Sequence, residues 1–219
     1  MEISDLIATA GTWLQGTGPE NDVVISTRIR LARNLAGMPF LIKMDDGHQA
    51  ETEETLTDAI AKADLPHTLT YFSMPDIGPL DRSLMVERHL ISPELARQQG
   101  HCGVALARDE TISIMVNEED HVRIQVIRAG LSLEAAFEEA TRVDDRLEEH
   151  LDYAFSARYG YLTACPTNVG TALRASVMLH LPALVLTRQI DKVFQAVTKM
   201  RLAVRGLHGE GTQASGDFY

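Results

Sequence analysis

The stretch GVALARDETISIMVNEEDHVRIQVI, residues 103–127, decides the fold of this chain. Short apolar runs alternate in it with polar turns, which predicts three successive strands. In the second and third runs, β-branched residues recur at every second position: Ile112, Ile114, Val116, Val122, Ile124 and Val126. Arg123 and Gln125 therefore fall on the opposite face of the third strand. Strands joined by short turns pair antiparallel, so we predict an antiparallel sheet.

A second stretch, VVISTRIRL at residues 23–31, has the same period of two. One face of the predicted strand carries Val23, Ile25, Thr27, Ile29 and Leu31. The other face carries Val24, Ser26, Arg28 and Arg30. This pattern is typical of a half-buried strand with two arginines on its polar face.

Helices are expected on either side of these strands. Residues 1–15 predict a short amphipathic helix, and residues 50–63 predict a second helix that Pro66 ends. Residues 92–100, SPELARQQG, predict a compact helix capped by Ser92.

The second half of the chain is also expected to be largely helical. Ser132 is predicted to cap a helix over residues 133–155. Its expected buried stripe consists of Phe137, Ala140, Val143, Leu147, Leu151 and Ala154. Further helices are predicted over residues 171–182 and 187–200, followed by a strand at 201–206.

Hairpins and helices therefore mix without a regular βαβ alternation. This order favours an α+β fold, a largely antiparallel sheet flanked by helices. We find no internal repeat and no obvious linker, and we treat residues 1–219 as one domain.

The composition limits the partners of the protein. A formal net charge of −11 argues against broad electrostatic binding to nucleic acid or to anionic lipid. A membrane span needs roughly 18 or more consecutive apolar residues, and the sequence has no such run. We therefore expect neither a nucleic acid nor a membrane as partner.

The cysteines indicate the compartment. Cys102 and Cys165 are too few for a disulfide scaffold and form no C-x-x-C pair. The N-terminal sequence also lacks the basic and apolar regions of a signal peptide. We expect a reducing, cytoplasmic location.

Several common nucleotide and catalytic signatures are missing from the sequence. It contains no G-x-x-x-x-G-K-[ST] motif, and no G-x-G-x-x-G lies between a strand and a helix. The protein-kinase H-R-D set, the G-x-S-x-G elbow and zinc-ligand spacings are absent too.

Two polar clusters lie on predicted strands. The first is STRIR, residues 26–30, whose two arginines suit a polyphosphate, although an exposed strand face would look the same. The second is NEEDHVR, residues 117–123, where three adjacent carboxylates repel one another and need a cation nearby. A solvated acidic turn is the alternative interpretation.

Two more clusters lie towards the C-terminus. In CPTNVGTALR, residues 165–174, a helix beginning at Thr171 is predicted to receive an anion at its N-terminus, close to Cys165. In RGLHGEGT, residues 205–212, glycines flank Glu210 in what reads as a mobile flap. The alternatives are a buried cysteine and an ordinary surface loop.

Taken in order, these clusters resemble the ATP:guanidino phosphotransferase family, which includes the phosphagen kinases and the bacterial protein-arginine kinases. The similar text runs through VVISTRIRLARNL, RHLIS, NEEDHVRIQ, CPTNVGTALRASV and RGLHGEGT. The resemblance implies a fold of the phosphagen kinase catalytic-domain type, ATP with Mg²⁺ as phosphoryl donor, and a guanidinium group as acceptor.

The resemblance also implies roles for particular residues. Glu119 and Glu210 would hold and activate the guanidinium, with Cys165 beside them, and Glu118 would support the magnesium shell through water. The implied nucleotide-binding residues are Ser26, Thr27, Arg28, Ile29, Arg30, His89, Arg123, Arg174, Ala175, Ser176, Val177, Met178, Arg205, Gly206, Leu207, His208, Gly209 and Glu210.

This assignment of roles is chemically reasonable. A guanidinium, with a pKa above ~12, is a poor nucleophile until a proton leaves, and paired carboxylates can orient it and accept that proton. Phosphoryl transfer otherwise needs mostly positioning and charge neutralisation, which arginines and Mg²⁺ provide.

The two ends of the chain bear on its place in the family. Only 25 residues precede Ser26, and this short N-terminus resembles the protein-arginine kinases, whose acceptor is an arginine in a protein. That resemblance further implies a zinc-binding activator protein, a Clp-type protease system and a homodimer formed through a C-terminal domain. Family members continue past the point where this chain stops, so we expect the catalytic domain to be C-terminally incomplete and the dimerisation and phosphoarginine-binding domain to be absent. A small-molecule guanidino kinase and a catalytically silent regulatory module are the alternatives.

Overall fold

The computed structural model describes residues 10–204 and 216–219. Its strands are β1 (Val24–Arg33), β2 (Leu69–Ser73), β3 (Gly103–Ala107), β4 (Ile112–Val116), β5 (Val122–Ala129), β6 (Phe155–Ser156), β7 (Gly160–Tyr161) and β8 (Leu173–Leu179). Its α-helices are α2 (Asp46–Lys62), α3 (Pro79–Glu87), α4 (Pro93–Arg97), α5 (Leu133–Glu148), α6 (Pro182–Leu186) and α7 (Ile190–Lys199). Short 3-10 turns are η1 (Thr12–Leu14), η2 (Leu41–Lys43), η3 (Met74–Asp76) and η4 (Pro166–Asn168).

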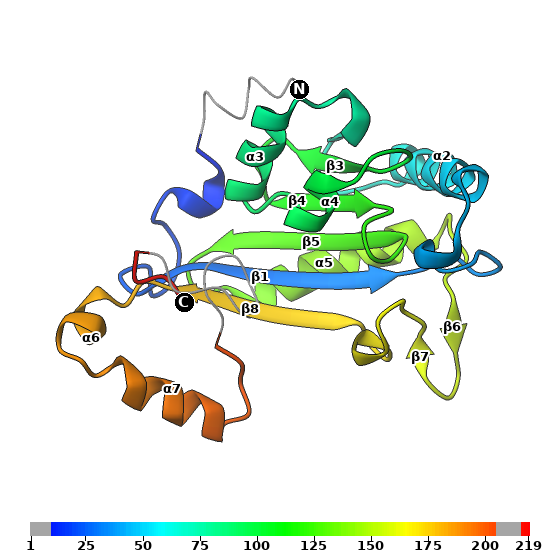
Figure 1. Ribbon diagram of the computed structural model, residues 1–219. Coiled ribbons are helices and arrows are strands. Elements are labelled where there is room, and N and C mark those ends of the chain that lie inside the picture. Colours follow the sequence, from blue (N-terminus) through cyan, green and yellow to red (C-terminus); the bar gives the residue numbers. More distant parts are fainter. Residues whose placement is uncertain (1–9, 205–215) are drawn as a thin grey trace.

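A six-stranded sheet organises the described part of the chain (Figure 1). Its strand order is β2-β3-β4-β5-β1-β8, and every neighbouring pair is antiparallel. The three strands predicted within residues 103–127 form its centre, and the strand predicted at 23–31 lies beside them as β1. The predicted α+β fold with a largely antiparallel sheet is confirmed.

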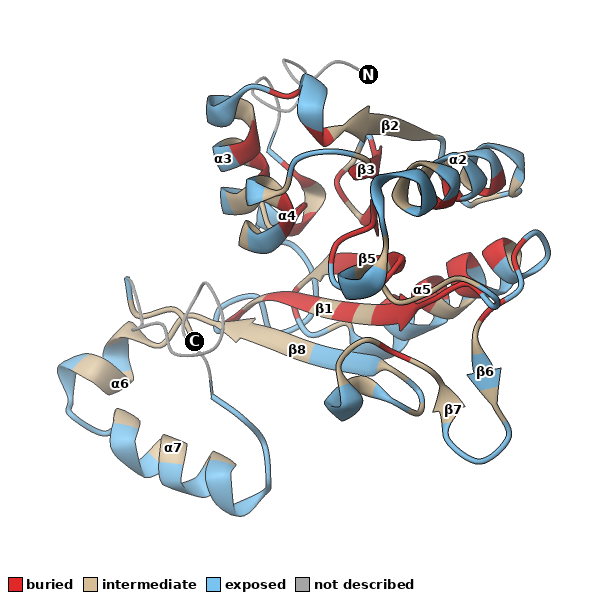
Figure 2. Ribbon diagram, turned by 45° about the vertical axis from the view of Figure 1, so that its right-hand side comes forward, coloured by how far each residue is buried: buried red, intermediate tan, exposed pale blue. Residues whose placement is uncertain are grey.

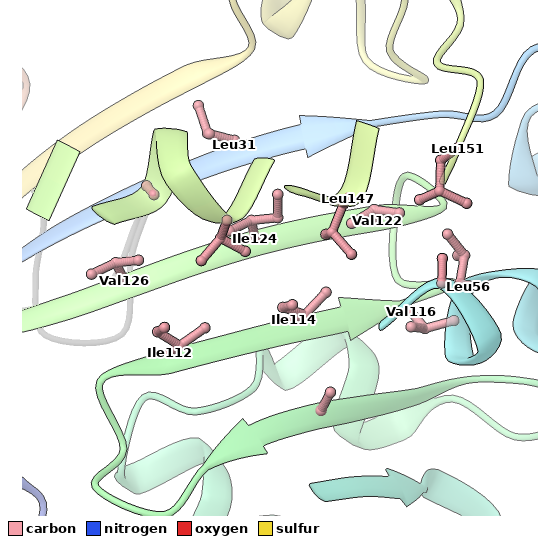
Figure 3. Close-up of a cluster of buried hydrophobic side chains, with 14 of the residues drawn as sticks. Leu31, Leu56, Ile112, Ile114, Val116, Val122, Ile124, Val126, Leu147 and Leu151 are labelled. Atoms are coloured by element: carbon pink, nitrogen blue, oxygen red, sulfur yellow. The ribbon is translucent and has the colours of Figure 1, made fainter. Parts of the chain in front are cut away.

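One face of the sheet packs on α5 and α2 (Figure 3). The register places Ile29, Val126 and Ile112 side by side across β1, β5 and β4, and all three are buried. On α5 the buried residues of this cluster are Ala136, Ala140, Val143 and Leu147. Burial of each large aliphatic side chain contributes about 1.5–3 kcal/mol, so this layer is the main source of stability.

The opposite face of the sheet is only half covered. α3 and α4 pack there over β3 and β4, through a second buried cluster that includes Met85, Leu95, Val104 and Met115. Figure 1 shows these two helices on the other side of the sheet from α5. On β5, β1 and β8 the same face carries arginines in place of apolar residues, as described below.

Two helix predictions are confirmed with different bounds, one shorter and one longer than expected. The helix expected at residues 92–100 is α4, and Ser92 caps it by accepting a hydrogen bond from the Leu95 amide at 3.0 Å. The helix expected at residues 50–63 is α2.

The helix expected at 133–155 is α5, which ends at Glu148 because the chain turns to bridge Tyr153 to Leu35 at the end of β1. Two details were wrong. Ser132 occupies the N-cap position, but its hydroxyl donates to the Ala129 carbonyl and makes no capping hydrogen bond, and Phe137 is 44% exposed.

The helix expected at residues 171–182 is wrong. Leu173–Leu179 form strand β8, which pairs along β1 from Leu31 to Val24. The residues of this segment are adequate helix formers, but the free edge of β1 offers a row of backbone donors and acceptors that β8 satisfies. Tertiary pairing therefore overrides local propensity here.

The C-terminal part of the described chain lies against the sheet less closely. β8, α6 and α7 contain no buried residue, which Figure 2 shows as a lack of red. The helix expected at 187–200 is confirmed as α7, whereas α6 was not predicted.

Other expectations fall partly outside the described residues. Of the strand expected at 201–206, residues 201–204 form no strand and the rest lies outside the described part. Of the helix expected at 1–15, only residues 10–15 are described, and they contain the 3-10 turn η1. Among the described helices, none is long and apolar enough to cross a membrane.

Candidate functional site

Four arginines gather on the half-open face of the sheet, on three neighbouring strands. Arg30 on β1 is paired with Arg174 on β8, and Ala32 is paired with Arg123 on β5. Paired residues in an antiparallel sheet point to the same side, as do residues two apart in one strand. Arg28, Arg30, Arg123 and Arg174 therefore share one surface, which we call the arginine face.

Without a bound anion, the positive charges of the arginine face repel one another. Burial, together with repulsion from Arg123 and Arg174, lowers the pKa of Arg28 to about 10. Its Nε donates a long hydrogen bond of 3.5 Å to the hydroxyl of Ser176. Guanidinium groups pair readily with phosphate oxygens, so the arrangement favours a polyphosphate.

Inorganic triphosphate should bind the arginine face and so raise the melting temperature of the protein. Arg174→Gln should weaken the affinity for triphosphate by about 10- to 100-fold, which corresponds to the loss of one charge-assisted hydrogen bond. The same substitution should not destabilise the unliganded protein, because it relieves repulsion on Arg28. Titration of the melting temperature at low and high salt measures both effects. Arg97→Gln, at an exposed position of α4, is the matched control. Equal triphosphate affinity in Arg174→Gln and the wild type would contradict the assignment.

The turn at residues 117–121, which we call the acidic turn, is adjacent to the arginine face through Arg123. Glu118 is buried, and its Oε1 accepts hydrogen bonds from Ser92 Oγ at 2.6 Å and from Arg123 Nη1 at 2.8 Å. Its Oε2 accepts from the Glu119 amide at 2.8 Å. Burial raises the pKa of Glu118, opposed by Arg123 and Ser92. Glu118 thus orients Arg123.

Glu119 differs from Glu118 in exposure. Its side chain is 45% exposed, and its Oε2 accepts a hydrogen bond of 3.2 Å from Arg123 Nη2. Arg123 therefore bridges two carboxylates, one buried and one open to solvent. Glu119 is the carboxylate of this pair that an incoming cation can reach.

The next two residues of the acidic turn, Asp120 and His121, are buried. His121 accepts from the Leu35 amide through Nδ1 at 3.0 Å and contacts the Pro39 carbonyl through Nε2 at 2.9 Å. This pattern requires a neutral imidazole with its proton on Nε2. Burial lowers the pKa of His121, opposed by the Pro39 bond and Asp120.

Acidification should therefore destabilise the protein through His121. Below about pH 6.5 the unfolded chain binds a proton that the folded state resists, so stability falls as the pH falls through this window. His121→Gln should flatten the dependence of unfolding free energy on pH between 7.5 and 5.5, by up to about 1.4 kcal/mol per pH unit. Urea unfolding at both pH values measures this. His150→Gln, at an exposed position, is the control, and an unchanged slope in His121→Gln would refute the prediction.

Cys165 is held close to the acidic turn. The amide of Ala164 donates to Asp120 Oδ1 at 2.6 Å, and the Cys165 thiol lies 2.9 Å from the Thr167 hydroxyl. The expected helix N-terminus at Thr171 is wrong, because β8 follows, so it gives neither an anion site nor thiolate stabilisation. Cys165 instead immediately precedes the short turn η4.

His89 is attached to the arginine face through its backbone. Its carbonyl accepts a 2.6 Å hydrogen bond from Gln125 Nε2, and Gln125 is paired with Arg30. The residue lies just after α3 with a positive φ of 55°, and its ring packs edge-on to Trp13 with centroids 5.6 Å apart. The structure thus places His89 with the predicted phosphate-binding arginines.

Comparison with known proteins bears on this arrangement of arginines and carboxylates. The profile of the family described as ATP:guanido phosphotransferase, C-terminal catalytic domain, matches residues 51–219. The chain belongs to this family. The family is enzymatic, and its members are guanidino phosphotransferases.

Named relatives agree with this membership. A protein-arginine kinase of Symbiobacterium thermophilum is 49% identical over a match covering 99% of this chain and 62% of that protein. One of Halothermothrix orenii is 50% identical, over 100% of this chain and 63% of that protein. The chain spans about 60% of the length of the curated relatives it matches.

Solved structures share the fold. The duplicated taurocyamine kinase from Schistosoma mansoni, with bound transition state analog components, matches with a TM-score of 0.82 and 27% identity, over 96% of this chain and 32% of that chain. Lombricine kinase matches with a TM-score of 0.78 and 28% identity, over 94% and 60%. The expected phosphagen kinase type of fold is confirmed.

The remaining predicted site residues of this family member divide by face. Ser26 and Met178 are paired with each other on the arginine face. The side chains of Thr27, Ile29, Ala175 and Val177 lie on the opposite face, so only their backbone is available to a ligand there. The predictions at Arg205, Gly206, Leu207, His208, Gly209 and Glu210 lie outside the described residues.

Sequence reasoning missed several polar residues that hold the site together. Ser92 was predicted only as a helix cap, yet its hydroxyl also donates to Glu118. Gln125 links Ser113 to the His89 carbonyl, and Asn34 joins the end of β1 to the acidic turn. An asparagine directly after a strand is a weak signal, because asparagine is common in turns anyway.

Proposed function

We propose that this chain transfers the γ-phosphoryl group of ATP to the guanidinium of arginine residues in proteins. The observation that carries the proposal is the arginine face, with the open carboxylate of Glu119 attached to its edge through Arg123. Membership of the guanidino phosphotransferase family and relatives that are 44–51% identical and named protein-arginine kinase support it. The proposal covers residues 1–219 as one catalytic domain.

The arginines would hold the phosphates of ATP. Arg28, Arg30, Arg123 and Arg174 neutralise charge on the nucleotide, together with Arg205 from outside the described residues. Because the strands fix the backbone of the first four, little reorganisation accompanies the reaction. His89 completes the nucleotide site beside Arg30.

The carboxylates would act on the acceptor. Glu119 aligns the guanidinium and accepts a proton from the attacking nitrogen, with Glu210 as its second carboxylate and Cys165 beside the same group. The nitrogen forms a bond to the γ-phosphorus while the bond to the β–γ bridging oxygen breaks, and ADP leaves with that electron pair. Glu118 keeps Arg123 oriented throughout, which explains why it is buried.

The residues suit Mg²⁺ held mainly by the nucleotide. Among the described residues, no group of three histidine, cysteine or acidic side chains is placed to hold a metal ion. Mg²⁺ usually keeps several waters and binds phosphates plus one or two carboxylates. The Glu118 side chain is 1% exposed, and its oxygens already accept from Ser92, Arg123 and the Glu119 amide, so the proposed role through water does not fit this arrangement. When bound, the ion would supply further neutralisation of the phosphate charge.

The experiment offers two acceptors in parallel. The protein, MgATP and either an arginine-rich unfolded protein or free arginine are incubated near neutral pH, and N-linked phosphate is measured by phosphorus NMR and mass spectrometry. Phosphoarginine in the protein acceptor supports the proposal. Transfer only to free arginine favours a small-molecule guanidino kinase, in line with the named function of the solved relatives. Binding of ATP without any transfer favours a silent regulatory module.

Further parts of the proposal concern partners and location. By family resemblance, they include a zinc-binding activator protein, a Clp-type protease system and homodimerisation in a longer form of the protein. A cytoplasmic location suits both the ATP requirement and the two free cysteines. Co-purification from cells with tagged protein tests the partners.

A further inference from the structure

A buried pair of polar side chains, Asn34 and Asp120, joins three segments that carry the proposed site. Asn34 directly follows β1 and is 2% exposed. Its Nδ2 donates to Asp120 Oδ1 at 2.6 Å and to the Leu162 carbonyl at 3.0 Å. Its Oδ1 accepts from the His121 amide at 2.9 Å. One side chain therefore contacts the acidic turn and the segment before Cys165.

Asp120 completes the connection from the other side. It is 1% exposed, and the Oδ1 atom that accepts from Asn34 also accepts from the Ala164 amide at 2.6 Å. The other oxygen, Oδ2, is buried and has no hydrogen-bond partner among the described residues. Only one of the two carboxylate oxygens, Oδ1, accepts hydrogen bonds. This indicates that Asp120 is needed for the placement of Oδ1 rather than for its negative charge.

We propose that Asn34 and Asp120 are positioning residues, which fix Glu119 and Cys165 relative to the arginines of β1. The proposal rests on the proposed function. Glu119 directly precedes Asp120, and Cys165 directly follows Ala164, so each reacting segment is tied to the pair within one residue. Arg28 and Arg30 are on the strand that Asn34 ends. The phosphate-binding and guanidinium-binding halves of the site thus meet at one hydrogen-bonded junction.

Phosphoryl transfer depends on in-line approach, and a misplacement of about 1 Å can cost on the order of 100-fold in rate. The acidic turn and the 162–165 segment are both loops, which are inherently less rigid than the sheet. Without the pair, the arginines would stay in place on their strands while the carboxylate and the thiol lost their fixed separation.

The fold should survive loss of the pair. His121 attaches the acidic turn to Leu35 and Pro39 independently, and backbone bonds join Ala36 to Asp152 and Ala154 to Asn34. Substitution of Asn34 or Asp120 therefore removes alignment but leaves the segments connected. This separates a positioning role from a purely structural one.

The test compares Asn34→Ala and Asp120→Ala with Asp120→Asn. The amide oxygen of Asp120→Asn can still accept from Asn34 and Ala164, so this variant should keep near wild-type turnover. The two alanine variants should lower kcat by about 10- to 100-fold while leaving the affinity for inorganic triphosphate within about twofold. Their Cys165 should also react about tenfold faster with iodoacetamide, because the 162–165 segment opens.

The control and the thiol readout are both available in this chain. Tyr71→Phe removes a half-buried 2.6 Å hydrogen bond to Glu53 at the far edge of the sheet, and should lower stability without lowering kcat. Cys102 is buried with its thiol pKa raised to about 11, so alkylation reports on Cys165.

The outcomes separate this inference from the proposed function. The positioning role would be overturned if the alanine variants kept the wild-type kcat and the wild-type rate of alkylation. It would also be overturned if Tyr71→Phe, at equal stability, showed the same loss of kcat. If the wild type transfers phosphate to neither acceptor, the proposed function fails. Alkylation and triphosphate binding then still decide whether the pair fixes the Cys165 segment independently of the arginines.

Discussion

Glu119→Gln is expected to lower kcat for transfer to a guanidinium acceptor by about 10²–10⁴-fold, the usual contribution of a positioned proton acceptor. Glutamine keeps the size of the side chain but has neither the charge that aligns the guanidinium nor the basicity to take its proton. Because the Glu119 side chain is 45% exposed and has one long contact with Arg123, stability should barely change. Steady-state kinetics with varied acceptor, together with urea unfolding, measure both quantities.

Substitutions of two other glutamates, Glu94 and Glu118, provide the comparison for this prediction. Glu94→Gln removes an exposed carboxylate with one arginine partner on α4, and should leave kcat unchanged. Glu118→Gln should act differently, because Glu118 is buried against Arg123 and Ser92, and should weaken nucleotide binding through Arg123. If Glu119→Gln had the same kcat as Glu94→Gln, Glu119 would not be a catalytic residue.

Arg33→Met is expected to cost about 3–5 kcal/mol of stability, the largest loss of stability among the variants proposed here. Arg33 Nη2 lies 2.5 Å from Asp144 Oδ2, and both side chains are buried between β1 and α5. The guanidinium also stacks 3.6 Å from the Tyr161 ring centroid and donates to the Thr171 carbonyl. Methionine would leave Asp144 as an uncompensated buried charge.

The loss of stability in Arg33→Met should depend on pH. Burial raises the pKa of Asp144, and Arg33 opposes that rise. Without Arg33 the folded pKa is higher still, so the folded state binds a proton that the unfolded chain releases above pH ~4. The deficit of Arg33→Met should therefore shrink as the pH falls from 7.5 to 5.5 in urea unfolding.

The double variant Arg33→Met, Asp144→Leu is the control for the buried pair. It removes both charges, so it should recover most of the lost stability. A double variant that remains as unstable as Arg33→Met would show that the contacts of Arg33 with Tyr161 and Thr171 matter more than the ion pair.

The central strands could be predicted from the sequence with little loss. Residues 103–127 alternate so regularly that only an antiparallel arrangement buries Ile112, Ile114 and Ile124 together. The same alternation correctly placed Arg123 and Gln125 on the other face, and Arg28 with Arg30. Local periodicity suffices where one face of a strand is buried.

The failures occurred where the environment, rather than the local pattern, decides. The segment TALRASVML was predicted as a helix and is an edge strand, because β1 satisfies its backbone. Phe137 was predicted buried, but it lies on the solvent side of α5, while Ala136 and Ala140 beside it face the core. Neither the pairing of this segment with β1 nor the exposure of Phe137 can be predicted from the local sequence.

The sequence by itself determined the residue types of the site and the family to which the chain belongs, because alternation and motif order are local properties. Only the tertiary structure decided that Arg30 lies opposite Arg174, that Glu118 is buried while Glu119 is open, and that Asn34 meets Asp120. These contacts join residues far apart in the chain. Strand register and burial set them, and both depend on how the whole sheet assembles.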